Sequence, residues 1–77
     1  MTKEMLIVKM EVLEGKIDGI LAKVFRNNEM TSEQKDKYSD MFMECKVRLI
    51  DVDGENDFLK IEDEYMRIVK EYENEKR

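Results

Sequence analysis

The sequence predicts an all-α fold, a three-helix antiparallel bundle with coiled-coil-like seams. Proline is absent, and charged residues make up 43% of the 77-residue chain while hydrophobic residues make up 42%. That balance is typical of helices that each bury one apolar stripe. Apolar residues also recur at alternating spacings of three and four in three segments, and turn residues separate the segments. We therefore expect a single helical domain over residues 1–77.

The first helix is expected over residues 3–27. Its apolar residues occupy the a and d positions of successive heptads, namely Leu6, Met10, Leu13, Ile17, Ile20 and Val24. Such a heptad seam packs against a neighbouring helix. The pair Asn27-Asn28 follows the last seam residue and ends the pattern.

The second helix is expected over residues 32–52. Thr31 and Gln34 have the spacing of a capping box, in which each side chain bonds the backbone N–H of the other residue. The apolar face of this helix consists of Tyr38, Met41, Phe42, Cys45, Leu49 and Val52. Asp53-Gly54 then breaks the helix.

The third helix is expected over residues 57–75, with either Asn56 or Asp57 as its N-cap. Its apolar face again follows the helical period, through Phe58, Ile61, Tyr65, Ile68 and Tyr72. Three apolar faces in one short chain predict three helices that share one core.

Strands are the alternative, because short apolar runs fit both periods. Residues 6–13 and 16–25 could pair as one hairpin, and residues 46–52 and 58–61 as a second. The long unbroken heptads favour helices.

The first helix carries a second stripe of apolar or small residues, nearly opposite the seam. It consists of Met5, Val8, Val12, Gly15, Gly19 and Ala22. A helix that is apolar on two sides is usually covered on both. Either the other two helices cover both faces, or the stripe meets a second copy of the chain. We favour the homodimer, because a short chain gains from a shared core.

Acidic residues gather in the last third of a chain whose formal net charge is −5. Their predicted role is a partner-binding patch, made of Asp51, Asp53, Glu55, Asp57, Glu62, Asp63 and Glu64. Phosphate binding requires a basic surface, so direct nucleic-acid binding is disfavoured. A basic protein surface, including one that normally grips phosphates, is the favoured partner.

Residues 51–62, DVDGENDFLKIE, resemble the twelve-residue calcium loop of EF-hand proteins. The resemblance implies oxygen ligands from Asp51, Asp53, Glu55, Asp57 and Glu62. The sequence departs from the family at Asn56, where the family has glycine, and at Leu59, which supplies no oxygen. A plain acidic turn and a surface for a basic partner are the alternatives, and we expect the turn, with no bound metal.

Catalytic groups are scarce. The chain has no histidine and one cysteine, Cys45, which lies in the seam of the second helix and is expected in the core. The chain therefore lacks histidine, the base that most often activates a hydroxyl nucleophile, and no glycine-rich phosphate loop or zinc motif occurs. We expect neither enzymatic activity nor a cofactor.

A second candidate contact surface is the apolar stripe Met43, Val47 and Ile50 on the second helix. The apolar run at residues 5–8 is too short and too close to Lys9 and Glu11 for a membrane span, so a cytoplasmic protein is expected.

By size, heptads and acidity the chain looks like the small helical proteins with which bacteriophages and mobile elements bind and redirect a host protein. The predicted function is therefore a stoichiometric modulator or inhibitor of a host protein. A structural or oligomerisation module is the alternative, and a single calcium-binding loop is third.

Overall fold

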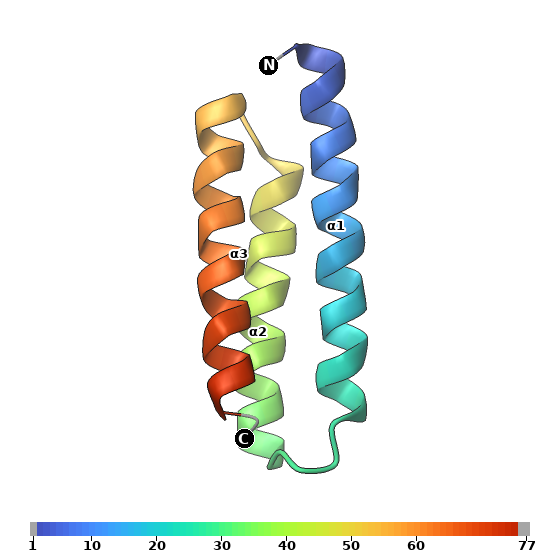
Figure 1. The fold of residues 1–77 in the computed structure, drawn as a ribbon, viewed down its shortest axis with the longest axis vertical. Helices are drawn as coiled ribbons and strands as arrows, with labels where there is room; N and C mark the ends of the chain where they lie inside the picture. Colours follow the sequence, from blue (N-terminus) through green and yellow to red (C-terminus); the bar gives the residue numbers. More distant parts are fainter. Residues whose placement is uncertain (1, 76–77) are drawn as a thin grey trace.

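The computed structural model describes residues 2–75 and confirms the all-α three-helix bundle (Figure 1). The helices are α1 (Lys3–Arg26), α2 (Ser32–Ile50) and α3 (Glu55–Glu75). They run alternately down, up and down in Figure 1, so α2 is antiparallel to both of its neighbours. No strand occurs between residues 2 and 75, and the hairpin alternative is therefore wrong.

The ends of α1 and the start of α2 follow the sequence signals. The Thr2 hydroxyl accepts a hydrogen bond from the Met5 N–H (3.1 Å), and the chain leaves α1 at Asn27. The capping box is confirmed. The Gln34 N–H donates to the Thr31 hydroxyl (3.1 Å), and the Thr31 N–H donates to the Gln34 side-chain oxygen (2.9 Å). Both bonds satisfy backbone donors that the first turn of a helix leaves free.

The connection between α2 and α3 has the expected length but lies two residues earlier, at residues 51–54 rather than 53–56. Helix α2 ends at Ile50, because the Val52 N–H turns back to the Leu49 carbonyl (3.4 Å) in a tighter, three-residue turn. Helix α3 begins at Glu55 rather than at residue 57, so neither Asn56 nor Asp57 is its N-cap.

The backbone conformation of one residue and one hydrogen bond explain the early start of α3. Gly54 precedes the helix with φ +108°, a backbone conformation that only glycine adopts readily. The carboxylate of Asp57, in the first turn, accepts a hydrogen bond from the Asp53 N–H (3.1 Å). Asp57 thus holds the turn in place from inside the helix, and its negative charge also suits the positive end of the helix dipole.

The core lies where the three predicted apolar faces meet. Its buried members are Leu13, Ile17, Val24, Met30, Tyr38, Phe42, Cys45, Leu49, Phe58, Ile61, Ile68 and Tyr72. All except Met30, which lies in the loop after α1, belong to the predicted apolar faces. Helix α2 packs against both neighbours, whereas α1 and α3 make the sparsest of the three helix contacts.

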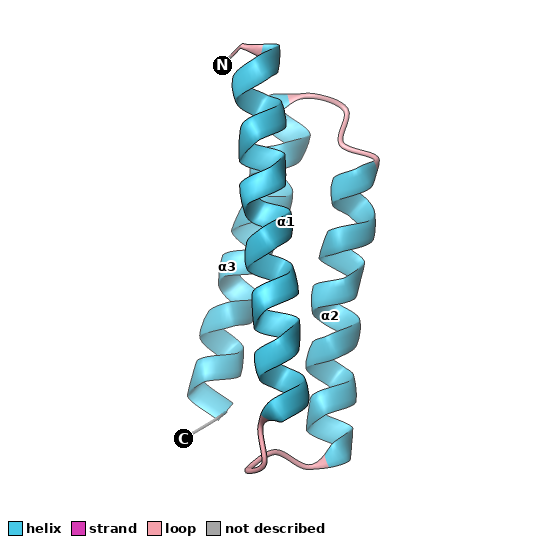
Figure 2. Cartoon of the chain, turned by 90° about the vertical axis from the view of Figure 1, so that its right-hand side faces the viewer, coloured by secondary structure: helices cyan, strands magenta, loops and turns pink. Residues whose placement is uncertain are grey.

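The bundle is elongated, with extents of 42 × 17 × 17 Å. The N-terminal turns of α1 project beyond the adjacent ends of α2 and α3 (Figure 1). Figure 2 shows α1 nearest the viewer, with α3 partly behind it and α2 beside it, and the side chains of Met5, Val8 and Val12 on α1 are exposed. The arrangement leaves the outer face of α1 free of intramolecular cover.

Candidate interaction surfaces

The seven acidic residues predicted as one patch do not share one surface. Asp51, Asp53 and Glu55 are exposed at the α2–α3 connection. Glu62 instead lines a groove beside α1, and Glu64 bonds Arg48 of α2. The reason is geometric, since successive residues of a helix are rotated by about 100° and positions 62 and 64 therefore point to opposite sides.

Glu64 belongs to the packing of α2 against α3. Its carboxylate accepts a hydrogen bond from the Arg48 guanidinium and lies 3.8 Å from that of Arg67. The bond from Arg48 raises the pKa of that guanidinium. A side chain that is already engaged between two helices contributes less charge to a partner surface.

Residues 51–62 do not form the twelve-residue loop of an EF-hand. Helix α3 begins at Glu55, the fifth of the twelve positions, and the Asp57 carboxylate is occupied by the Asp53 N–H. Within residues 2–75, no group of three Asp, Glu, Cys or His side chains is placed to hold a metal ion. In this structure the segment is a tight acidic turn followed by a helix.

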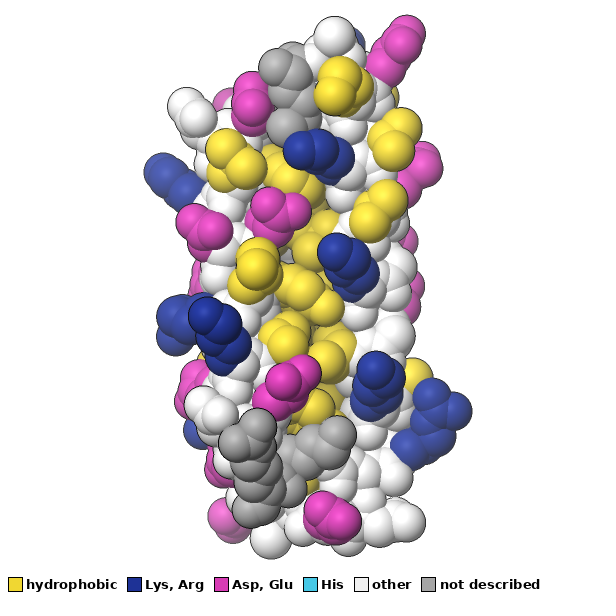
Figure 3. All heavy atoms as spheres, viewed as in Figure 1, with side chains coloured by type: hydrophobic (Ala, Val, Ile, Leu, Met, Phe, Trp, Pro, Cys, Tyr) yellow, Lys and Arg dark blue, Asp and Glu magenta, His cyan; other side chains and the backbone are white. Residues whose placement is uncertain are grey.

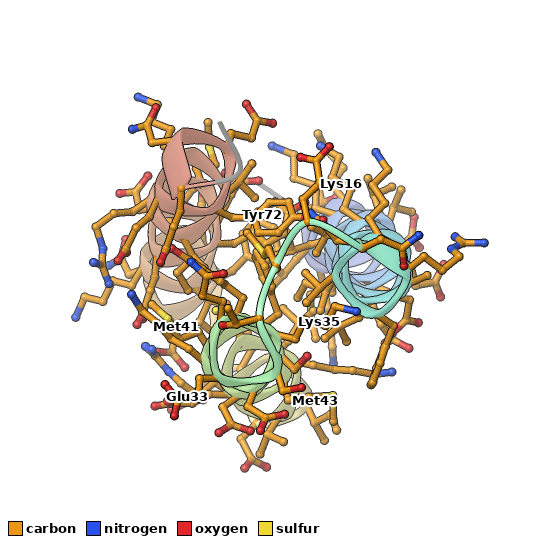
Figure 4. The ribbon with its side chains drawn as sticks, turned by 90° about the horizontal axis from the view of Figure 1, so that it is seen from below. Lys16, Glu33, Lys35, Met41, Met43 and Tyr72 are labelled. Carbon is orange, nitrogen blue, oxygen red and sulfur yellow. The ribbon has the colours of Figure 1, made fainter. Side chains whose placement is uncertain are left out.

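The apolar stripe predicted on α2 is exposed. The exposed fractions of Met43, Val47 and Ile50 are 45%, 55% and 72%. Seen along the bundle in Figure 4, Met43 points away from the centre on the α1 side of α2, whereas Met41 lies on the α3 side. The stripe therefore lies outside the core contacts of α2.

Carboxylates that the sequence analysis missed lie beside this stripe. Asp36, Asp40 and Glu44 are exposed, and none has an ion-pair partner within residues 2–75. Their regular spacing of four residues was the available signal, because it places them on one side of a helix. We define the α2 outer face as Asp36, Asp40, Met43, Glu44, Val47, Ile50 and Asp51.

The second stripe of α1 is also uncovered. We call it the α1 stripe, with the six residues predicted for self-association: Met5, Val8, Val12, Gly15, Gly19 and Ala22. Met5, Val8 and Val12 are 53%, 57% and 53% exposed, and a Cβ atom built on Gly15 or Gly19 would meet nothing within 4 Å. The interpretation in which α2 and α3 cover both sides of α1 is therefore wrong, and the homodimer stays a prediction.

A shallow groove runs between α1 and α3, where the helix contact is sparse. It is lined by Leu13, Lys16, Glu62, Tyr65, Met66, Val69 and Lys70. Figure 3 shows the result as a band of hydrophobic side chains between the two helices, with basic side chains along the α1 edge. This opening lies on the side of the bundle that α2 does not close.

The titratable groups with shifted pKa values serve the packing of the helices. Burial and a hydrogen bond donated to the Glu75 carboxylate raise the pKa of Tyr38. The same bond lowers the pKa of Glu75. Burial raises the pKa of the Cys45 thiol, which disfavours the reactive thiolate. These shifts arise from burial and from a contact between α2 and α3.

No protein-family model matches the chain, and searches of curated proteins and of solved structures found no match. Among residues 2–75, no helix combines the length and the apolar character that a membrane span requires. The exposed surfaces are therefore the basis for assigning a function.

Proposed function

We propose that this chain is a protein-interaction module that binds a protein partner stoichiometrically through the α2 outer face. The observation that carries the proposal is the exposed row Met43, Val47 and Ile50 beside carboxylates that make no ion pair within residues 2–75. Grouped exposed apolar side chains with a polar border are characteristic of protein-binding surfaces. Methionine adds a side chain that adapts its shape to a partner.

The chemistry of this surface indicates what the partner presents. Asp36, Asp40 and Glu44 favour a basic surface, and the apolar row favours exposed aliphatic or aromatic side chains within it. The net charge of −5 adds long-range attraction to such a surface. A protein region that normally grips phosphates has this character, so the module could occupy it without touching nucleic acid itself.

The proposal changes the location of the predicted binding surface. Of the seven acids expected to act together, Glu62 and Glu64 point to different sides of α3. Asp51 stays at the end of the α2 outer face, and Asp53 continues the negative charge into the turn. The binding residues therefore come mainly from α2 and the turn after it.

Modulation of a host protein is the role that we propose for this binding. The small size, the acidity and the exposed apolar row suit a protein that works by covering part of another protein. The resemblance to the small helical proteins of bacteriophages and mobile elements supports the same role. Absence of catalysis and a cytoplasmic location stay predictions.

The test is affinity capture of the tagged protein from a bacterial lysate at moderate salt, with mass spectrometry of what is retained. Wild type is compared with a charge variant, Asp40→Lys/Glu44→Lys, and with an apolar variant, Met43→Ser/Val47→Ser. Circular dichroism verifies that each variant keeps its helices. We expect one stoichiometric partner with wild type and its loss with both α2 variants.

A matched control on α3 gives the experiment its specificity. Met66 is an exposed methionine and Glu73 an exposed carboxylate outside the α2 outer face, so Met66→Ser/Glu73→Lys changes the same chemistry elsewhere. The control should retain the partner. Equal capture by wild type and both α2 variants would refute the proposed surface.

An oligomerisation module is the second candidate, and the uncovered α1 stripe favours it. In that case the chain would recover only itself from the lysate, and substitutions on the α2 outer face would change nothing. The two candidates therefore predict different retained proteins.

A further inference from the structure

The α1 stripe is the seam of a second heptad pattern, and charged residues border it on both sides. Its a positions are Met5, Val12 and Gly19, and its d positions are Val8, Gly15 and Ala22. The e positions of the same heptads are all lysines, Lys9, Lys16 and Lys23. The g positions are all acidic, Glu4, Glu11 and Asp18. Positions e and g flank the contact between two coiled-coil helices and set which partner fits and in which orientation.

The separation of the two signs selects a parallel arrangement of two copies. In a parallel pair, a g residue of one helix lies beside an e residue of the other. Here that brings an acid against a lysine in every heptad. In an antiparallel pair e lies beside e and g beside g, which would bring lysines together and acids together. Like charges at such positions oppose association.

We infer that the outer face of α1 pairs in parallel with α1 of a second copy of this chain. Three charge pairs would form on each side of the seam. In these pairs Glu4 meets Lys9, Glu11 meets Lys16, and Asp18 meets Lys23 of the second copy. The apolar residues of the α1 stripe fill the seam between them.

The charged residues of this arrangement are available in the structure. Glu4, Lys9, Glu11 and Lys16 are exposed, and none has an ion-pair partner within the part of the chain that the structure describes. Asp18 is different, because its carboxylate lies 2.7 Å from the Lys46 ammonium of α2. The third pair therefore shares Asp18 with α2, and the first two carry the greater weight.

The two seams of α1 do not compete. Ile17 and Val24, which are buried in the bundle core, occupy f positions of the outer heptad, opposite its seam. The bundle core and the seam with a second copy therefore use opposite sides of one helix. Pairing leaves the core of each copy unchanged.

The glycines of the α1 stripe fit this arrangement. Neither Gly15 nor Gly19 is required by packing inside one copy, since an added Cβ would meet open space at both. Glycine is unfavourable inside a helix, so a contact that needs it has to lie outside the single chain. In the parallel pair, Gly15 and Gly19 let the two backbones approach closely, while Met5, Val8 and Val12 supply the buried apolar side chains.

Charge exchange between two variants tests the pairing, with sedimentation equilibrium as the readout. The middle charge pair joins Glu11 of one copy to Lys16 of the other. Lys16→Glu places an acid at both of its positions, and Glu11→Lys places a base at both. Each variant alone should associate about tenfold more weakly than wild type, because attraction becomes repulsion in two symmetric pairs. An equimolar mixture should regain the wild-type affinity as a heterodimer. Lys60→Glu and Glu73→Lys on α3 are the charge-matched controls and should associate as wild type does.

Cysteine cross-linking tests the orientation. Parallel pairing places Met5 beside Met5 of the second copy, so Met5→Cys should form a disulfide-linked dimer under mild oxidation. Antiparallel pairing would instead link Met5→Cys to Ala22→Cys in a mixture of the two variants. Wild type, whose Cys45 is buried, is the control and should stay unlinked.

Three results would each overturn the inference. These are a wild-type protein that stays a monomer at every concentration, unchanged association of both charge variants, and disulfide linkage only in the mixture of Met5→Cys with Ala22→Cys.

The α2 outer face and the α1 stripe are different residues on different helices. Loss of partner capture by the α2 variants would leave the cross-linking result unaffected, so either proposal can fail alone.

Discussion

Helices α1 and α3 run in the same direction and both pack on α2, but polar side chains fix them to very different degrees. Helix α3 is joined to α2 by hydrogen bonds from Arg48 to Glu64 and from both Tyr38 and Gln34 to Glu75, and by Lys37, whose ammonium lies 3.4 Å from Glu71. Helix α1 is joined to α2 by the pair Lys46–Asp18 (2.7 Å) and by a bond from Lys35 to the Phe25 carbonyl (3.2 Å).

Aromatic packing shows the same contrast. The ring centroids of Tyr38 and Tyr72 lie 5.4 Å apart, and those of Phe42 and Tyr65 lie 5.9 Å apart, all between α2 and α3. The core residues of α1 are aliphatic, with Leu13, Ile17 and Val24 buried. Edge-to-face aromatic pairs add directional attraction to their burial, whereas aliphatic contacts depend mainly on area.

Helix α3 is therefore adapted mainly to α2, whereas α1 has one face for the bundle core and a second face that the bundle leaves uncovered. The buried residues of α3 lie on one side of it, and its other side is largely charged. Helix α1 has a buried seam inside and the uncovered α1 stripe outside. A helix of this second kind is usually covered by another molecule.

The largest expected effect is loss of the aromatic centre by Phe42→Ala. Phe42 is fully buried and contacts rings of α3, so its truncation should lower the free energy of unfolding by about 3–5 kcal/mol. Urea denaturation followed by circular dichroism measures the change. Val12→Ala, on the outer face of α1, is the control and should cost less than about 0.5 kcal/mol in a dilute monomer. Equal losses in the two variants would remove the distinction between core and outer face.

The next substitution should stabilise a single copy of the chain but weaken the association of two copies. Gly15→Ala/Gly19→Ala should stabilise an isolated chain by up to about 2 kcal/mol, since each glycine costs about 1 kcal/mol in a helix and neither added methyl group meets an atom. In a close parallel pair, the same methyl groups should weaken self-association. Thermal melts across a range of protein concentrations measure both effects. A variant that melts higher than wild type at every concentration would show that the glycines serve no contact between copies.

A smaller effect concerns the end of the α2–α3 contact. The Tyr38 pKa is raised in the folded chain by burial and by Glu75, so ionisation of Tyr38 favours unfolding. Its contribution to stability is complete below the unfolded pKa of about 10 and decreases as the pH rises above that value. Tyr38→Phe should cost about 1 kcal/mol at neutral pH and should flatten the stability curve above pH 10.

Glu75, the hydrogen-bond partner of Tyr38, gives a corresponding prediction for stability at low pH. The Glu75 pKa is lowered, mainly by the Tyr38 hydroxyl, so the contribution of Glu75 is present above its unfolded pKa and is lost as the pH falls. Glu75→Gln should therefore reduce the acid-side slope of stability against pH. Urea midpoints measured from pH 3 to 11 test both variants, and parallel curves for wild type and variants would contradict the assigned bond.

The smallest effect is expected at the ion pair between α1 and α2. Lys46→Met removes a partly exposed bridge to Asp18, and the change in unfolding free energy should stay below about 0.5 kcal/mol and decrease with added salt. The same substitution frees Asp18 for Lys23 of a second copy, so self-association should be unchanged or slightly stronger. A loss above about 1 kcal/mol would mean that α1 depends on this bridge more than on its aliphatic seam.

The sequence predicted the helices well because each carries a long apolar repeat and a specific stop or cap. The Thr31–Gln34 capping box formed as expected, since both of its partners lie within one turn. The start of α3 was missed because it depends on the positive φ of Gly54 and on a backward bond from Asp53 to Asp57. Neither the φ angle of Gly54 nor this hydrogen bond can be read from the residue types of the segment.

The surfaces were harder to predict than the core. Counting acids along the chain suggested one patch, but Glu62 and Glu64 diverge once residues 55–75 are helical. The carboxylates beside Met43 and Val47 were missed for the opposite reason, because Asp36, Asp40 and Glu44 are spread along the sequence and meet only on the helix. Surface predictions therefore required the helical rotation of each residue as well as its charge.

The uncovered side of α1 is explained if it binds a second copy of the chain, as we infer above. Sedimentation equilibrium of wild type and of Val12→Lys tests this binding, because Val12 belongs to the α1 stripe and contributes little to the stability of the folded monomer. We expect a wild-type mass that approaches twice 9.3 kDa as the protein concentration rises, and a folded Val12→Lys variant whose mass stays at 9.3 kDa. The same mass for both proteins at every concentration would contradict it.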